Sequence, residues 1–182
     1  MNFMNHKEIN IRQLQESDKS QLARLANNSN ISNNLRDYFP NPYDDEDAES
    51  FIKMTIAQDP TTSFGIEFEG ELCGVISLIL QNDIYRKSAE IGYWLGEPYW
   101  GKGITTKAVS QITEYGFEKL NLIRIYAGII EYNTSSMRVL EKSGFKMEGI
   151  FQKAIIKNDK IWDEHRYYIL NKGYIKNKDK QL

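Results

Sequence analysis

The chain has 182 residues, of which 41% are hydrophobic and 26% are charged, so it can form one globular core and is not globally disordered. Its 23 basic and 25 acidic side chains give a net charge of −2, and no basic excess indicates nucleic acid as a partner. A single cysteine, Cys73, excludes an internal disulfide, and with only His6 and His165 beside it we expect no metal centre.

The chain begins with polar residues and lacks the apolar stretch of a signal peptide. No run approaches the ~18 apolar residues of a membrane span. We therefore expect a cytoplasmic protein without a membrane partner. The sequence predicts one domain over residues 1–171 and a polar tail over residues 172–182, and it leaves open whether the protein is a monomer or a homodimer.

The amino-terminal part predicts one strand and two helices. Ile9 and Ile11 indicate a short strand, and a helix capped by Ser17 or Asp18 follows. A second helix is expected to begin at Asp44 or Asp45 and to end before Pro60.

The middle of the chain predicts three strands. Residues 63–68 and 72–80 are rich in β-forming residues, and Glu69-Gly70 between them favours a tight hairpin. A third strand is expected over residues 88–95, where alternation places Glu90, Gly92 and Trp94 on one face.

The remaining elements alternate between helix and strand. After a loop at 96–103, apolar residues at helical spacing predict a helix beginning near Ile104. A strand at 124–130 and a helix at 133–143 ended by Gly144 follow, and two strands at about 145–156 and 160–170 close the chain. This order predicts a mixed α/β domain, with antiparallel strands first and a strand–helix–strand crossover after them.

The loop before the helix at Ile104 is a candidate phosphate site. Gly101 and Gly103 carry no side chain that would block a ligand, and a helix amino terminus carries partial positive charge. The glycines alone fit an ordinary turn equally well, because the loop lacks the spacing of a dinucleotide or P-loop fingerprint.

Three segments in this order resemble a known family: residues 90–95, the loop 101–103 and residues 133–145. They are similar to the GNAT superfamily of acetyl-CoA-dependent N-acetyltransferases, and in particular to the Rim-type enzymes that acetylate the amino termini of ribosomal proteins. The resemblance spans nearly the whole chain. It implies an α/β (α+β) fold with a mixed, mostly antiparallel sheet flanked by helices, in which a splayed parallel strand pair admits the pantetheine arm.

The resemblance also implies a set of residues that bind acetyl-CoA. The pyrophosphate-loop signature falls on Trp100, Gly103 and Thr105, where Trp100 replaces the usual Gln or Arg and Thr105 a smaller residue. Main-chain amides make this cradle, so both replacements are tolerable; Thr105 could also merely cap the helix. The implied cofactor-binding residues are Trp94, Leu95, Trp100, Gly101, Lys102, Gly103, Ile104, Thr105, Thr106 and Asn133.

Two residues are candidates for proton transfer. Glu90 is the candidate general base, and its alternative role is an exposed carboxylate paired across strands. By resemblance, Ser136 could protonate the leaving thiolate, a task that other branches give to a tyrosine where this chain has Leu140. Water is the alternative acid. Asn133 could simply cap its helix, a role compatible with cofactor binding.

Acidic and aromatic residues could surround the acceptor. The acidic run that begins at Asp44 lies where the family places the acceptor site, although acids also favour a helix amino terminus. Cys73 lacks a nearby activating base, so a covalent cysteine intermediate is not expected. Aromatic residues that could line an acceptor pocket or simply fill the core are Tyr38, Phe39, Tyr43, Trp162, Tyr167 and Tyr168.

The resulting hypothesis is an enzyme without a metal that transfers acetyl from acetyl-CoA directly to a primary amine, in particular a protein or peptide amino terminus. A polyamine or an aminoglycoside is the alternative acceptor. A non-catalytic acyl-CoA sensor is the alternative of a different class, because the tyrosine acid is missing at Leu140.

Overall fold

The computed structural model describes residues 8–174. Its contacts divide the chain into two compact units. The first unit comprises residues up to Ile76 together with Tyr93–Ala108, and the second comprises Ser77–Gly92 and the residues from Val109 onward. Three elements, the strands at 71–80 and 88–95 and the helix at 104–118, contribute to both units.

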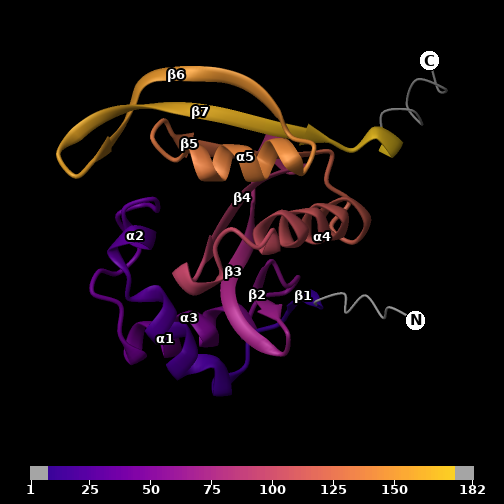
Figure 1. Cartoon of the computed structure of the whole chain (residues 1–182). Coiled ribbons are helices and arrows are strands. Elements are labelled where there is room, and N and C mark those ends of the chain that lie inside the picture. Colours follow the sequence, from indigo (N-terminus) through magenta and orange to yellow (C-terminus); the bar gives the residue numbers. More distant parts are fainter. Residues whose placement is uncertain (1–7, 175–182) are drawn as a thin grey trace, which may run out of the picture. The chain divides into compact units, whose positions relative to one another are not determined.

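Within the described residues, the fold is built on a mixed sheet of seven strands, in the order β1-β2-β3-β4-β5-β7-β6 (Figure 1). The pair β4–β5 is parallel, whereas the pairs β1–β2, β5–β7 and β6–β7 are antiparallel. This is the mixed sheet with one parallel pair that the sequence predicts, and helices flank it.

In the first unit, β1 (Ile9–Arg12) pairs with β2 (Ser63–Phe68), and α1 (Lys19–Ala26) packs beside α3 (Asp45–Ile56) (Figure 1). Their apolar faces meet in one core because leucine, isoleucine and alanine recur at helical spacing. Its fully buried members include Leu14, Leu22, Ala26, Ala48 and Ile52.

Helix boundaries in the first unit follow capping chemistry. The helix α3 begins at Asp45, one of the two predicted starts, and Asp44 caps it: its carboxylate accepts hydrogen bonds from the amides of Glu46 and Asp47. Asp18 stands at the start of α1 without capping it, since its carboxylate instead accepts hydrogen bonds from Arg12 at 2.8 and 2.9 Å. The sequence missed the short helix α2 (Ser29–Ser32), which is a single turn.

The predicted hairpin connects β2 to β3 (Glu71–Leu80). Its turn residues Glu69 and Gly70 have φ angles of 53° and 86°, the left-handed pair that a two-residue turn requires. After a 3₁₀ turn at Asp83–Tyr85, β4 (Ser88–Leu95) matches its predicted bounds. A second 3₁₀ turn, Glu97–Tyr99, leads toward α4 (Ile104–Glu118).

In the second unit, β5 (Arg124–Ile130) pairs with β7 (Lys160–Leu170), and β6 (Lys146–Lys157) forms a long hairpin with β7. The helix α5 (Thr134–Lys142) lies along this hairpin (Figure 1). At the hairpin turn, Asn158 and Asp159 have φ angles of 52° and 58°, the left-handed conformation that a two-residue hairpin turn requires.

The two faces of this part of the sheet differ. One face carries Ile125 and Tyr167 and packs against helices: Gly116 of α4 approaches the Ile125 side chain, and the Tyr167 hydroxyl bonds Glu141 of α5 at 3.1 Å. The opposite face, which we call the Glu90 face, follows from the register. Its members include Glu90, Tyr126, Gly128, Phe151, Glu164, Arg166 and Tyr168.

Residues 175–182 of the predicted polar tail lie outside the described residues. Between residues 8 and 174, none of the helices combines the length and the apolar composition needed to cross a membrane.

Candidate acetyl-transfer site

The loop at 96–103 in the first unit, which we call the glycine loop, is folded back onto the end of β4. The indole Nε1 of Trp100 donates a 2.6 Å hydrogen bond to the carbonyl oxygen of Leu95. Within the loop, the amides of Tyr99 and Trp100 donate to the carbonyls of Gly96 and Glu97. Trp100, predicted as a loop residue that replaces a polar one, therefore fixes the shape of the loop.

The two glycines provide the open approach that a phosphate group requires. Gly101 and Gly103 have φ angles of 74° and 77°, and a Cβ on either would meet no atom within 4 Å. The first bond of α4 runs from the Lys107 amide to the Gly103 carbonyl at 3.2 Å. Open space therefore lies beside the two glycines just before α4, where the amino terminus of a helix favours an anion.

The end of β4 is held close to β3 by a glycine that the sequence analysis did not single out. A Cβ at Gly74 would lie 2.3 Å from the Trp94 carbonyl oxygen and 3.0 Å from the Leu95 Cα. The Gly96 amide donates to the Cys73 carbonyl at 2.8 Å. An isolated glycine inside a strand is the signal that could have found this close approach.

Side chains around the loop serve packing. The Trp94 ring packs on the core of the first unit and contacts Phe39 edge-on, with ring centroids 6.2 Å apart. The Lys102 ammonium lies over the rings of Tyr99 and Phe68, at 5.4 and 5.9 Å from their centroids.

In the second unit, the parallel ladder between β4 and β5 is short. It comprises three pairs and ends where Glu90 opposes Tyr126. The strand β5 continues to Ile130 and remains paired with β7 over its whole length.

Asn133 and Ser136 lie at the start of α5 in the second unit. The Asn133 Oδ1 accepts a 3.2 Å hydrogen bond from the Ser136 amide, so Asn133 does cap its helix. The cap occupies Oδ1 and leaves the Nδ2 group to donate elsewhere. Leu140 is fully buried, so the position that holds a tyrosine acid in other branches is a core position here.

The residues considered for the acceptor divide between core and surface. Tyr43 is buried, and desolvation, followed by the charges of Asp47 and Asp44, raises its pKa to about 12. Tyr167 is buried on the helix-covered face, whereas Tyr168 lies on the Glu90 face. In the acidic run, Asp44 and Asp47 form a capping box at the start of α3.

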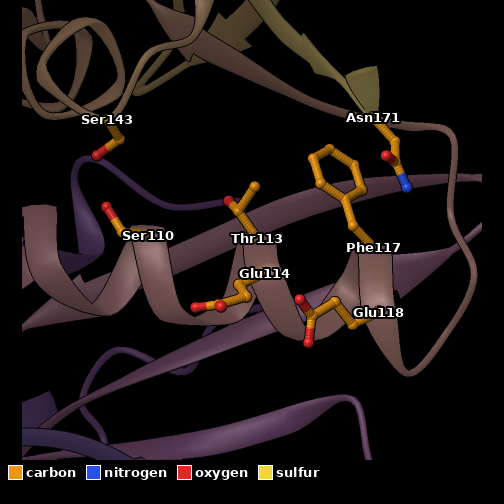
Figure 2. Close-up of a pocket in the computed structure, with 7 residues that line it drawn as sticks. All are labelled: Ser110, Thr113, Glu114, Phe117, Glu118, Ser143 and Asn171. Carbon is orange, nitrogen blue, oxygen red and sulfur yellow. The ribbon is translucent and has the colours of Figure 1, made fainter. Parts of the chain in front are cut away.

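Two cavities were not predicted. One of about 380 Å³ lies in the second unit, where α4 faces the end of α5 (Figure 2). Another of about 320 Å³ in the first unit is bordered by Glu97, whose carboxylate accepts hydrogen bonds from Asn28 and Asn30 that lower its pKa. The first cavity is lined by Ser110, Thr113, Glu114, Phe117, Glu118, Ser143 and Asn171, none of which was a predicted site residue.

Comparison with known proteins decides the family. Residues 8–146 match the model of the acetyltransferase (GNAT) domain. The chain belongs to the GNAT acetyltransferase family. It is 30% identical to the uncharacterised N-acetyltransferase YnaD of Bacillus subtilis, over 92% of this chain and 96% of that protein.

Solved structures of GNAT acetyltransferases share the fold. The spermidine N-acetyltransferase of Vibrio cholerae, solved with CoA and spermine, has a TM-score of 0.76 and 28% identity, covering 92% of this chain and 98% of that one. RimL, a ribosomal L7/L12 α-N-protein acetyltransferase solved with coenzyme A, has a TM-score of 0.77 at 22% identity, covering 91% and 95%. The latter likeness shows the fold alone.

The predicted family, fold and enzyme class are thereby confirmed for this GNAT acetyltransferase. The expected likeness to Rim-type enzymes is also found, since the putative ribosomal N-acetyltransferase YdaF of Bacillus subtilis is 36% identical over 60% of each chain. The individual site residues stay predictions. The first unit gathers Trp94, Leu95 and the loop residues, while Glu90, Asn133 and Ser136 belong to the second.

Proposed function

We propose that this protein transfers acetyl from acetyl-CoA to a primary amine, and that the acceptor is a protein or peptide amino terminus. The observation that carries the proposal is the loop at Gly101 and Gly103, with open space beside the first turn of α4 in a chain of the GNAT family. The residues present fit a pyrophosphate, since main-chain amides are its donors. A cytoplasmic location remains part of the proposal.

The proposed reaction is direct. The neutral amine nitrogen attacks the thioester carbon, a C–N bond forms and the C–S bond breaks. Glu90, directly or through water, takes the proton that the amine loses. The Leu95 amide donates to the carbonyl oxygen as negative charge develops there. Ser136 or water returns a proton to the coenzyme A thiolate.

The amino-terminal acceptor is favoured by the lower pKa of its ammonium group. An α-amine with a pKa near 8 is about one-tenth neutral at pH 7, whereas an amine with a pKa near 10.4 is below one part in 1,000. An α-amine therefore needs less help from a base. A small polyamine is the second candidate, because a relative with 28% identity over nearly its whole length was solved with CoA and spermine.

The test is release of coenzyme A thiol by the purified protein with acetyl-CoA and either an amino-terminal peptide or a polyamine. We expect turnover that falls at least ~100-fold in Glu90→Gln, the range for loss of a general base. Glu114→Gln, which neutralises an exposed carboxylate on α4, is the matched control and keeps full turnover. Acetyl-CoA binding without turnover on any amine would instead identify an acyl-CoA sensor.

A further inference from the structure

Glu164 is a carboxylate held by only one of its oxygens. Arg166 donates from Nε at 2.9 Å and from Nη2 at 2.6 Å, and both bonds end on Oε1. Within residues 8–174, the structure places no hydrogen-bond donor on Oε2. The Glu164 side chain is 18% exposed, so Oε2 is a partly desolvated acceptor.

A glycine clears the space that this carboxylate occupies. A Cβ at Gly128 of β5 would lie 2.7 Å from the Glu164 Cδ and 2.9 Å from Oε2. Any other residue at this position would displace the carboxylate from the surface of the sheet. Gly128 therefore allows Glu164 to lie flat over β5.

The strand register brings this carboxylate toward the proposed base. Gly128 is one same-face repeat along β5 from Tyr126, and Tyr126 opposes Glu90. Same-face residues repeat about every 7 Å along a strand, and strands lie about 4.8 Å apart. Gly128, with the Glu164 carboxylate above it, is thus roughly 8 Å from Glu90 on the same face.

The arginine that holds Glu164 is itself fixed. The Arg166 guanidinium lies 4.2 Å from the ring centroid of Phe151 and 5.5 Å from that of Tyr126. Stacked aromatic rings limit the rotamers of the guanidinium, so the carboxylate that it holds is preorganised.

We propose that Glu164 is a specificity-determining residue that binds a second cationic group of the acceptor, through Oε2, while the reacting amine lies at Glu90. This inference rests on the proposed acetyl transfer and specifies its acceptor: an amine with a further ammonium or guanidinium group a few bonds away. A diamine or a peptide with a basic second residue both supply this chemistry. A charge-assisted hydrogen bond to the carboxylate is the recognition.

The test compares acceptors that differ in one ammonium group. The pairs are 1,4-diaminobutane against 1-aminobutane, and an Ala-Lys peptide against the same peptide with norleucine in place of lysine. We expect a kcat/KM at least ~10-fold higher for the dicationic member of at least one pair, the range for a hydrogen bond to a charged group. The pair that responds distinguishes the small amine from the peptide.

In Glu164→Gln we expect the preference for the dicationic acceptor to fall about tenfold, because the KM for that acceptor rises, while kcat and the KM for acetyl-CoA stay unchanged. Glutamine still accepts the Arg166 bonds, so the fold is kept. Gly128→Ala gives the same loss with the charge retained. Glu148→Gln, which removes a carboxylate paired with Arg124 in the same unit, leaves the preference intact.

An unchanged preference in Glu164→Gln overturns the inference, as does an equal loss for both members of each pair, which indicates a structural role. Isothermal titration of 1,4-diaminobutane and the Ala-Lys peptide into the protein with coenzyme A measures cation binding by Glu164, which we call the anchor, without turnover. Binding weakened by Glu164→Gln in a protein that acetylates no amine would support the anchor while refuting the proposed function. Equal binding to wild type and variant would refute the anchor.

Discussion

At the residue scale, the environment of Cys73 bears on the route that the acetyl group takes. Its side chain is fully buried, and Sγ donates to the Ile66 carbonyl at 3.2 Å. Burial first, and then the charge of Glu67, raises the pKa of Cys73 to about 12. The thiolate that a covalent intermediate needs is therefore scarce at neutral pH.

We accordingly predict that Cys73→Ala retains kcat/KM within about twofold, because no acetyl-cysteine forms. Steady-state kinetics provides the first check. Mass spectrometry of the wild type after incubation with acetyl-CoA alone provides the second, and an acetylated Cys73 there would contradict direct transfer.

A second residue-scale prediction concerns Gly74. A methyl group at this position would meet the Trp94 carbonyl oxygen at 2.3 Å, and backbone cannot move aside as a flexible side chain can. We expect Gly74→Ala to lower the free energy of unfolding by about 1–3 kcal/mol and to raise the KM for acetyl-CoA, because the end of β4 must shift.

The matched control for Gly74 is Gly149→Ala, since a Cβ at Gly149 meets nothing within 4 Å. Urea unfolding and acetyl-CoA titration of the two variants separate the steric effect from the loss of a glycine as such. Equal stability and equal KM for both variants would disprove the close approach of the two strands.

At the element scale, the start of α5 combines a structural and a proposed functional role in Asn133. Its Oδ1 caps the helix through the Ser136 amide, while acetyl-CoA binding would use Nδ2. Asn133→Ala is expected to cost about 1 kcal/mol in unfolding free energy. Asn133→Ser keeps a capping oxygen and so restores most of that stability, yet it leaves the KM for acetyl-CoA raised. Full recovery of that KM in the serine variant would limit Asn133 to capping.

Also at the element scale, the sequence predicts almost every helix and strand, because each is marked locally. Asp44 caps α3, Gly144 with its φ of 86° ends α5, and the two-residue turn at Glu69 requires left-handed backbone. The single-turn helix α2 was missed, since four residues carry no periodicity. Asp18 was correctly placed but wrongly expected to cap, because its partner Arg12 belongs to a strand rather than to the helix.

At the scale of the whole molecule, the sequence predicts the parts of the site that main chain provides. The glycines of the loop and the capping residue of α5 can be recognised directly in the amino-acid sequence. The close approach at Gly74 and the position of the Glu164 carboxylate over Gly128 depend on strand register, which no local pattern specifies. Two of the proposed aromatic residues, Tyr43 and Tyr167, are buried. For Tyr167, the alternation along its strand does not say which face the helices cover.

The most direct test of the central claim, that acetyl-CoA binds at the glycine loop, uses three proteins: wild type, Gly103→Trp and Gly70→Trp. Gly70 and Gly103 both have positive φ and open surroundings in the first unit, so both tryptophan variants carry a similar backbone strain. They differ in whether the new ring fills the loop.

The measurement is the thermal midpoint of each protein with and without acetyl-CoA. A ligand at about 100 times its Kd adds about 2.7 kcal/mol, which is roughly 5–10 °C for a domain of this size. We predict this shift for the wild type and for Gly70→Trp, and its loss in Gly103→Trp. An equal shift in all three proteins would place the cofactor elsewhere, and no shift in the wild type at millimolar acetyl-CoA would contradict the account.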